Sequence, residues 1–262
     1  VHIDNTPPTA SLSGLQTGVW YTGTVTVTVD AFDAESGVAS VRLQVREPGG
    51  SWEDAPAPCD NLTHVSGTTY TCDLDTSKLP EGARDVRAVA VDRAGNTGYS
   101  QIVSPNFDNR SPQVTLNPIP NFIRGTITLQ ASATDDGSGV HEVRIERAVH
   151  GTGVWVEVCA KQAPPYTCEF DTTSYADGTK FDFRAVATDN VSNQAISSDQ
   201  RERMVDNVAP VDASRFEGET GIDPEWRAND QVVEVVFDDG DGSGVDRVEW
   251  ELRDKQGNWL AG

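Results

Sequence analysis

The sequence predicts an all-β protein built from tandem antiparallel β-sandwiches, two of them complete and a third truncated. Three observations support this prediction: alternating apolar and polar positions, a long internal repeat, and no stretch with the periodicity of a helix. The alternation is unbroken in residues 24–29 and returns at residues 126–129. Half-buried strands of this kind, separated by Gly, Pro, Asn and Asp, are typical of antiparallel sheets.

The internal repeat has a period of about one hundred residues and is marked by three motifs in a constant order. An Asp-Asn pair before a proline comes first, Ser-Gly-Val second, and a Trp 15 or 16 residues after that glycine third. These markers begin at Asp4, Asp108 and Asp206; at Ser36, Ser138 and Ser243; and at Trp52, Trp155 and Trp259. A fourth motif, Arg-Ala-Val-Ala, begins at Arg87 and Arg184.

The repeat divides the chain into residues 1–107, 108–205 and 206–262, with residues 1–5 read as the tail of a preceding unit. The third segment holds only the first half of a unit, so its strands would lack core partners and leave an open edge. We therefore expect chain beyond Gly262 to complete it. Strand addition by a neighbouring subunit is the alternative.

Within the first unit the elements follow one another at short intervals. The expected strands, in chain order, are one after the proline motif, 24–32, 39–46, a short strand at Trp52, 69–72, 84–91 and a last strand that runs into the linker. Residues 33–37 and 92–96 supply the turns between neighbouring strands. About seven strands in about 100 residues match an immunoglobulin-like sandwich.

Charge excludes some partners. The chain has 41 acidic and 20 basic side chains, a net charge of −21, so it should repel nucleic acid and anionic membranes. No apolar run approaches the ~18 residues of a membrane helix. Carboxylates are instead good ligands for hard cations such as calcium.

Cysteine positions indicate the compartment. The four cysteines fall into one close pair per complete repeat, Cys59 with Cys72 and Cys159 with Cys168. Three connectivities are possible, and we predict the two local bridges. The spacing does not suit zinc, and disulfides imply an exported protein.

The motifs taken together resemble the bacterial Ig-like repeats found in tandem in very large surface proteins. The resemblance covers residues 4–207 and the first half of the third unit. It implies a stalk or scaffold rather than a catalyst, although such repeats also occur as accessory parts of secreted enzymes. We expect no enzymatic activity, because no nucleophile elbow, phosphate loop or zinc motif is present.

One constellation of side chains points to a ligand. In a sandwich of this type the linker, the second-to-third-strand turn and the last turn lie at one pole, so their Asp and Asn residues should converge as calcium ligands. The alternative is that they only form turns. The candidates are Asp4, Asn5, Asp33, Glu35, Asp92 and Asn96; Asp108, Asn109, Asp135, Asp136, Asp189 and Asn193; and Asp206, Asn207, Asp238, Asp239 and Asp241.

Two function hypotheses follow. The first is an extracellular stalk or filament of a giant adhesin, in which calcium stiffens the junctions and the partners are neighbouring repeats or a host surface. The second is an accessory spacer or glycan-binding region of a secreted polysaccharide-active enzyme. In the second case Trp52 and Trp155 would be the sugar platform, although packing explains their repeated position better.

Overall fold

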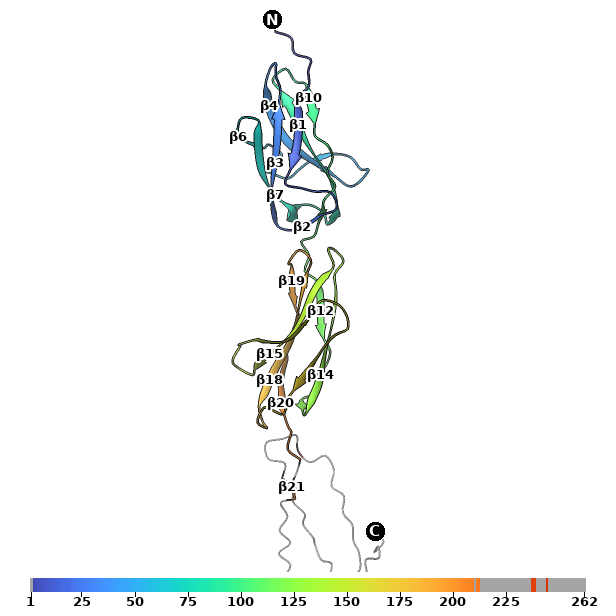
Figure 1. The fold of residues 1–262 in the computed structure, drawn as a ribbon, viewed down its shortest axis with the longest axis vertical. Helices are drawn as coiled ribbons and strands as arrows, with labels where there is room; N and C mark the ends of the chain where they lie inside the picture. Colours follow the sequence, from blue (N-terminus) through green and yellow to red (C-terminus); the bar gives the residue numbers. More distant parts are fainter. Residues whose placement is uncertain (1, 210, 213–236, 239–243, 245–262) are drawn as a thin grey trace, which may run out of the picture.

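The computed structural model describes residues 2–209, 211–212, 237–238 and 244. Two β-sandwiches lie one after the other along the long axis, and the chain enters each at one pole and leaves it at the opposite pole (Figure 1). The described residues include no helix that is long and apolar enough to cross a membrane.

The first sandwich pairs a sheet ordered β1-β3-β7-β6 with a sheet ordered β10-β9-β4-β5, and a small sheet, β2-β11-β8, closes the pole that faces the second sandwich. In the small sheet β2 and β11 run parallel. The elements are β1 (Thr9–Ser13), β2 (Trp20–Tyr21), β3 (Thr24–Phe32), β4 (Val38–Arg46), β5 (Glu53–Asp54), β6 (Thr63–Ser66), β7 (Thr69–Asp75), the 3-10 turn η1 (Thr76–Lys78), β8 (Gly82–Ala83), β9 (Asp85–Asp92), β10 (Thr97–Tyr99) and β11 (Asn106–Phe107).

The second sandwich repeats this plan with a three-stranded sheet, β12-β14-β17, and a larger sheet, β13-β20-β18-β15-β16, in which β19 also pairs with β18. Its strands are β12 (Gln113–Leu116), β13 (Phe122–Ile123), β14 (Thr126–Thr134), β15 (Val140–Val149), β16 (Val156–Lys161), β17 (Tyr166–Asp171), β18 (Lys180–Asp189), β19 (Gln194–Ile196) and β20 (Gln200–Val205). It has no counterpart of β6.

Little of the third unit is described. Two short strands, β21 (Val211–Asp212) and β22 (Phe237–Asp238), pair antiparallel. Three predictions for this unit concern residues outside the described part of the chain. They are its incompleteness, the acidic loop at Asp239 and Asp241, and the position of Trp259.

Each sandwich has its own core, formed by the alternation read from the sequence. On β3 the side chains of Val27 and Val29 are fully buried, whereas Thr26 faces solvent on the opposite side of the sheet. Full burial of an aliphatic side chain contributes about 1.5–3 kcal/mol. The second core is more aromatic, with Phe170, Phe181 and Phe183 packed edge to face.

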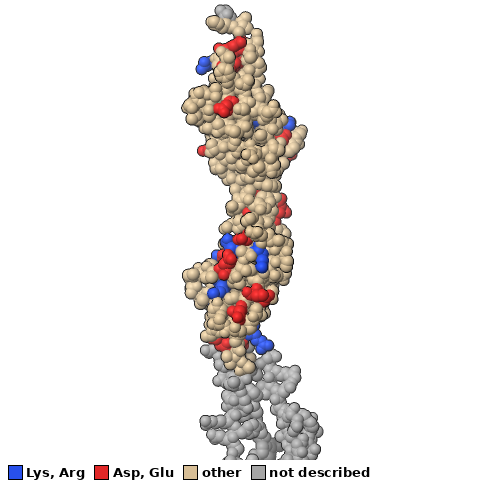
Figure 2. Space-filling model, in the orientation of Figure 1, with Lys and Arg blue, Asp and Glu red and all other residues tan. Residues whose placement is uncertain are grey.

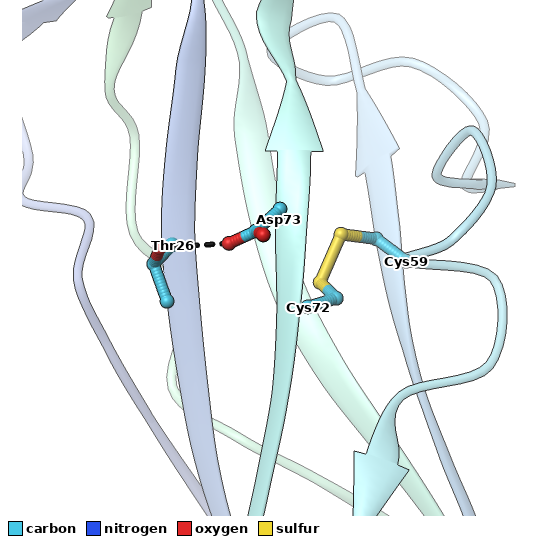
Figure 3. The surroundings of a disulfide bond; sticks show 4 residues. All are labelled: Thr26, Cys59, Cys72 and Asp73. Carbon is cyan, nitrogen blue, oxygen red and sulfur yellow. Dashed lines mark hydrogen bonds between the residues drawn. A yellow bond between two sulfur atoms is a disulfide. The ribbon is translucent and has the colours of Figure 1, made fainter.

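Both disulfides close within their own sandwich, Cys59 with Cys72 and Cys159 with Cys168. Figure 3 shows the first bridge beside the Thr26–Asp73 hydrogen bond of 2.7 Å. Cys72 lies on β7, while the carbonyl of Cys59 accepts a hydrogen bond from the backbone N–H of Leu43 on β4. The first bridge therefore joins the two sheets of its sandwich at one lateral edge. The second bridge does the same, because Cys159 lies on β16 and Cys168 lies on β17 of the other sheet.

Candidate metal sites at the poles of the repeats

Three acidic side chains converge at the same pole of each described sandwich, as the sequence predicts. Asp4, Asp33 and Asp92 form the first triad, and Asp108, Asp135 and Asp189 form the second. In each triad one ligand atom from each residue lies within 4.8 Å of the other two. The members come from the linker, the β3–β4 or β14–β15 turn, and the turn after β9 or β18.

Backbone N–H groups hold the second triad in place. The carboxylate of Asp108 accepts hydrogen bonds from the N–H groups of Arg110 (3.2 Å) and Ser138 (2.7 Å). Asp135 accepts bonds from the N–H groups of Gly137 (3.1 Å) and Gly139 (2.7 Å). The same loops that present the carboxylates thus also fix their orientation, since each acidic side chain organises its own turn.

Asp189 completes the second triad. Its carboxylate accepts hydrogen bonds from the N–H group of Val191 and from both the N–H and the side-chain amide of Asn193, at 2.7–2.9 Å. The first triad uses equivalent bonds, in which the acceptors are Asp4, Asp33 and Asp92 and the donors are Thr6, Ser36, Glu35, Gly37 and Asn96. An ionised carboxylate has about four acceptor positions, so unused lone pairs remain in every case.

The triads concentrate negative charge without a counter-charge. The exposed fractions of Asp92, Asp108 and Asp189 are 2%, 1% and 1%. Among the described residues no Lys, Arg or His forms an ion pair with any triad carboxylate. Buried like charges of this kind are costly unless a cation or a proton offsets them.

The pKa directions reflect the two environments. Burial, followed by the charges of Asp108 and Asp189, raises the pKa of Asp135. The pKa of the half-buried Asp4 is lowered, chiefly by the neighbouring hydroxyl of Ser36 and then by the N–H group of Thr6. The second triad is therefore the one with the stronger unmet demand for positive charge.

A buried hydroxyl at each site also lacks a partner. Ser36 Oγ and its counterpart Ser138 Oγ are both inaccessible to solvent and make no hydrogen bond of acceptable geometry. Both residues belong to the turns that carry the triads, and their N–H groups bond Asp4 and Asp108. Clustered carboxylate oxygens beside an unsatisfied hydroxyl fit the oxygen-rich shell of six to eight ligands that calcium takes.

The other residues predicted as calcium ligands do not belong to the two triads. Asn96 and Asn193 turn their amide nitrogens toward Asp92 and Asp189, so they orient the carboxylates instead of adding oxygen ligands. Glu35 accepts only a 3.5 Å bond from the Thr6 hydroxyl, and Asn5 and Asp136 are exposed. Asp206 follows β20 at the position equivalent to Asp108, and Asp238 lies on β22; neither belongs to a triad of the described residues.

Asn109 does not join the triad, contrary to the sequence prediction. Its side-chain oxygen points back into the first sandwich, where it accepts hydrogen bonds from the hydroxyls of Thr22 (3.3 Å) and Thr76 (2.9 Å) and the N–H of Gly23 (2.9 Å). Successive side chains of extended chain point to opposite sides, so Asp108 and Asn109 face different repeats. Asn207 bonds Gly125 and Thr172 in the same way.

Direct contacts cross the junction beside this Asp-Asn pair. The Thr22 hydroxyl donates to the side-chain oxygen of Asn193 (3.1 Å), and Asn193 donates to the carbonyl of Asp108 (3.1 Å). Glu81 accepts a 3.0 Å bond from the N–H of Asn109 and lines, with Trp20 and Asp135, a cleft of about 290 Å³ between the sandwiches. Sequence reasoning missed Thr22 and Glu81, because only the folded junction relates them to the linker.

The repeated tryptophans are packing residues at the sheet surface. The sequence predicts a short strand at Trp52, and this prediction is wrong: Trp52 directly precedes β5. The guanidinium groups of Arg46 and Arg87 pack over its ring at 4.3 and 4.1 Å, and Arg184 packs over Trp155 at 4.1 Å. Because cations already occupy these ring surfaces, the geometry does not favour a sugar platform.

The fold and the repeated poles define a tandem array of Ig-like sandwiches. A family model described as the bacterial Ig domain matches residues 8–88 and 119–181, more than half of the chain. The chain belongs to the bacterial Ig domain family. No curated protein sequence matches it.

Solved structures with some likeness include a tetra-tandem repeat from the extending region of a large adhesion protein (20% identity, TM-score 0.31, 78% of this chain and 50% of that one). Another comes from a study of the host-cell-surface retention of a 1.5-MDa bacterial ice-binding adhesin (15%, 0.41, 78% and 65%). A third is the endo-β-1,4-mannanase from Thermotoga petrophila (20%, 0.32, 41% and 21%). The chain spans less than two thirds of each of these structures, and such low similarity transfers no activity.

Proposed function

We propose that this chain is part of an extracellular structural stalk of a bacterial surface protein, and that calcium bound at the poles stiffens its junctions. Membership of the bacterial Ig domain family, two disulfides and the end-to-end placement of the sandwiches support a structural role outside the cytoplasm. The partners in this proposal are the neighbouring repeats of the same chain.

The observation that carries the calcium proposal is the second triad. Its linker member, Asp108, is 1% exposed, and its immediate neighbour Asn109 is bonded to the preceding sandwich. A cation held by Asp108, Asp135 and Asp189 would therefore tie the linker to two turns of the second sandwich while Asn109 ties it to the first. Restricting the linker at both ends reduces bending between the repeats.

The test compares the chain with calcium and with excess chelator. Calcium at one hundred times its dissociation constant adds about 2.7 kcal/mol to the stability of the state that binds it, so the melting temperature should rise. Small-angle scattering should show a narrower distribution of inter-repeat angles. If chelation alters neither quantity, the triads serve only as turn residues.

A matched pair of variants separates the two sites. Asp135→Asn should abolish the effect of calcium on bending, because it removes one charged ligand at the described junction. Asp33→Asn should remove binding at the first pole and leave bending between the two described sandwiches unchanged. Loss of the bending effect in both variants would show that calcium acts elsewhere.

A further inference from the structure

The two turns that carry triad residues differ at one position beside the linker carboxylate. The β14–β15 turn has Gly137 directly before its Ser-Gly-Val motif, and the β3–β4 turn has Glu35 at the equivalent position. The backbone bonds of the two turns correspond, because the N–H of Gly137 donates to Asp135 at 3.1 Å and the N–H of Glu35 donates to Asp33 at 3.2 Å. The difference at this position therefore lies in the side chain.

Gly137 leaves open the space that the Asp108 carboxylate occupies. A Cβ atom at residue 137 would lie 2.6 Å from Oδ1 of Asp108 and closer still to its Cγ and Oδ2, well inside van der Waals contact. The φ angle of Gly137 is not positive, unlike those of Gly139 and Gly151, so a side chain would meet no backbone strain there. Glycine is needed at this position for room and not for conformation.

The first sandwich shows the arrangement when this position carries a side chain. Its linker carboxylate, Asp4, is half-buried, whereas Asp108 is 1% exposed. The N–H of Ser36 donates to Asp4 at 3.1 Å, but the equivalent N–H of Ser138 donates to Asp108 at 2.7 Å. The linker carboxylate beside the glutamate thus lies farther out of its turn than the one beside the glycine.

We propose that Gly137 is the positioning residue that lets Asp108 enter the second triad, and that Glu35 keeps the first pole a more open and weaker cation site. The inference rests on the proposed function, because it ranks the two calcium sites. The rigidity of the ligands is one of the factors that set calcium affinity. The junction between the two described sandwiches would therefore hold its cation more tightly than the pole that begins the first sandwich.

The first measurement needs no cation. In the calcium-free full chain, the amide proton signal of Ser138 reports the short bond to Asp108, because amide protons in shorter hydrogen bonds resonate farther downfield. Gly137→Ala should move this signal upfield and leave the signal of Ser36 unchanged. An unchanged Ser138 signal in the folded variant overturns the proposal.

Calcium titration followed by the same two amide signals gives the affinity of each site. Gly137→Ala should weaken binding at the second triad by about tenfold or more, as changes to groups that orient metal ligands commonly do, and should leave the first triad unaffected. Glu35→Gly should tighten binding at the first triad. If Gly137→Ala does not fold, the substitutions of Glu35 still decide.

Glu35→Ala is the matched control, because it removes the same carboxylate but keeps a Cβ atom. Tighter binding with Glu35→Gly than with Glu35→Ala supports the proposal, since a merely structural role of the turn would not produce a gain of affinity. Equal binding by the two variants would mean that charge and not room ranks the sites, which overturns it. If Ser138 responds to Gly137→Ala but the parent chain binds no calcium, the positioning of Asp108 stands and the proposed function fails.

Discussion

The Asp-Asn pair in the linker joins two repeats through two adjacent side chains that point in opposite directions. Asp108 reaches forward to the turns of the second sandwich, and Asn109 reaches back to the end of the first. Asn207 repeats the backward contact at the end of the second sandwich, so the arrangement is a property of the repeat and not of one junction. Its cost is the burial of polar groups, which makes each of these residues sensitive to substitution.

Asn109→Ala should destabilise the first sandwich. The substitution leaves the N–H of Gly23 without its acceptor. The hydroxyls of Thr22 and Thr76 lose one acceptor each and keep the side-chain oxygen of Asn193 and the carbonyl of Gly23. The loss of such hydrogen bonds costs about 0.5–1.5 kcal/mol. Denaturant unfolding measures the change. The control is Asn117→Ala, which removes only an exposed side-chain bond to Gln130 and should change stability by less than about 0.5 kcal/mol.

Two capping carboxylates should contribute to acid sensitivity. The hydroxyl of Ser77 chiefly lowers the pKa of Asp75, and the N–H of Thr173 chiefly lowers that of Asp171, both from the ordinary value of 3.8. A lowered pKa means that the folded state favours the charged form, so this stabilisation is present above pH 3.8 and is lost as the pH falls through the lower folded value.

Thermal melts of an Asp75→Asn, Asp171→Asn double variant between pH 5 and strongly acidic pH check this expectation. The variant should be less stable than the parent at pH 5, and the difference should shrink as the pH falls. A difference that is constant with pH would contradict the linkage. Asp60→Asn, in an exposed loop, serves as the control.

At the scale of elements, the strands that alternate were predictable and the irregular segments were not. The strand expected at residues 24–32 is β3 with the same ends, and those expected at 39–46 and 84–91 are β4 and β9 within one residue. The alternation of apolar and polar residues determines where these three strands lie, because one face of each strand is buried. Trp52 was misplaced because its position depends on two arginines from other strands, a tertiary contact with no local signal.

The triads were predictable and the junction contacts were not, for a related reason. Sandwich topology brings Asp108, Asp135 and Asp189 to one pole, so repeated acidic turns sufficed to find them. The bond between Thr22 and Asn193 joins two folded units, and neither repeat alone contains it. The alternation of extended chain at Asp108 and Asn109 was the one available signal for the backward contact.

Removing the bridges should cost the two sandwiches nearly the same amount. The cysteines are 13 residues apart in the first and 9 in the second, and the chain-entropy model gives about 3 kcal/mol for either loop. Paired Cys→Ala variants of each bridge, unfolded in denaturant, measure the loss. A loss confined to the sandwich that carries the substitutions would show that the two cores unfold independently.

At the scale of the whole molecule, the described sandwiches form a rod that is narrow at the junction between them (Figure 1). On the face shown in Figure 2 the first sandwich is covered mostly by uncharged side chains, whereas acidic and basic groups gather on the second. Because the junction is narrow, the orientation of one sandwich relative to the other depends on the short linker and on the hydrogen bonds around Thr22 and Asn193.

Thr22→Val should loosen the rod without unfolding either sandwich. Valine keeps the shape of threonine but removes the hydroxyl that bonds Asn109 and Asn193. Small-angle scattering should reveal a broader distribution of inter-repeat angles, with the melting temperatures reduced by only a few degrees. Unchanged scattering would mean that the linker alone sets the angle. Thr28→Val is the control, because this half-buried threonine of β3 lies on the strand face opposite Val27 and Val29 and far from the linker.

The bridges also limit how far the molecule can lengthen under tension. Chain between bonded cysteines cannot extend while the bond holds, and extended chain spans about 3.5 Å per residue. The bridged cysteines are 13 and 9 residues apart in the chain, and their Cα atoms are 5.3 Å and 6.1 Å apart. Each intact bond therefore prevents the release of contour length, about 40 Å in the first sandwich and about 25 Å in the second. Pulling single molecules before and after reduction should reveal these two increments. A stalk of such repeats would therefore lengthen less in an oxidising environment than its residue count allows.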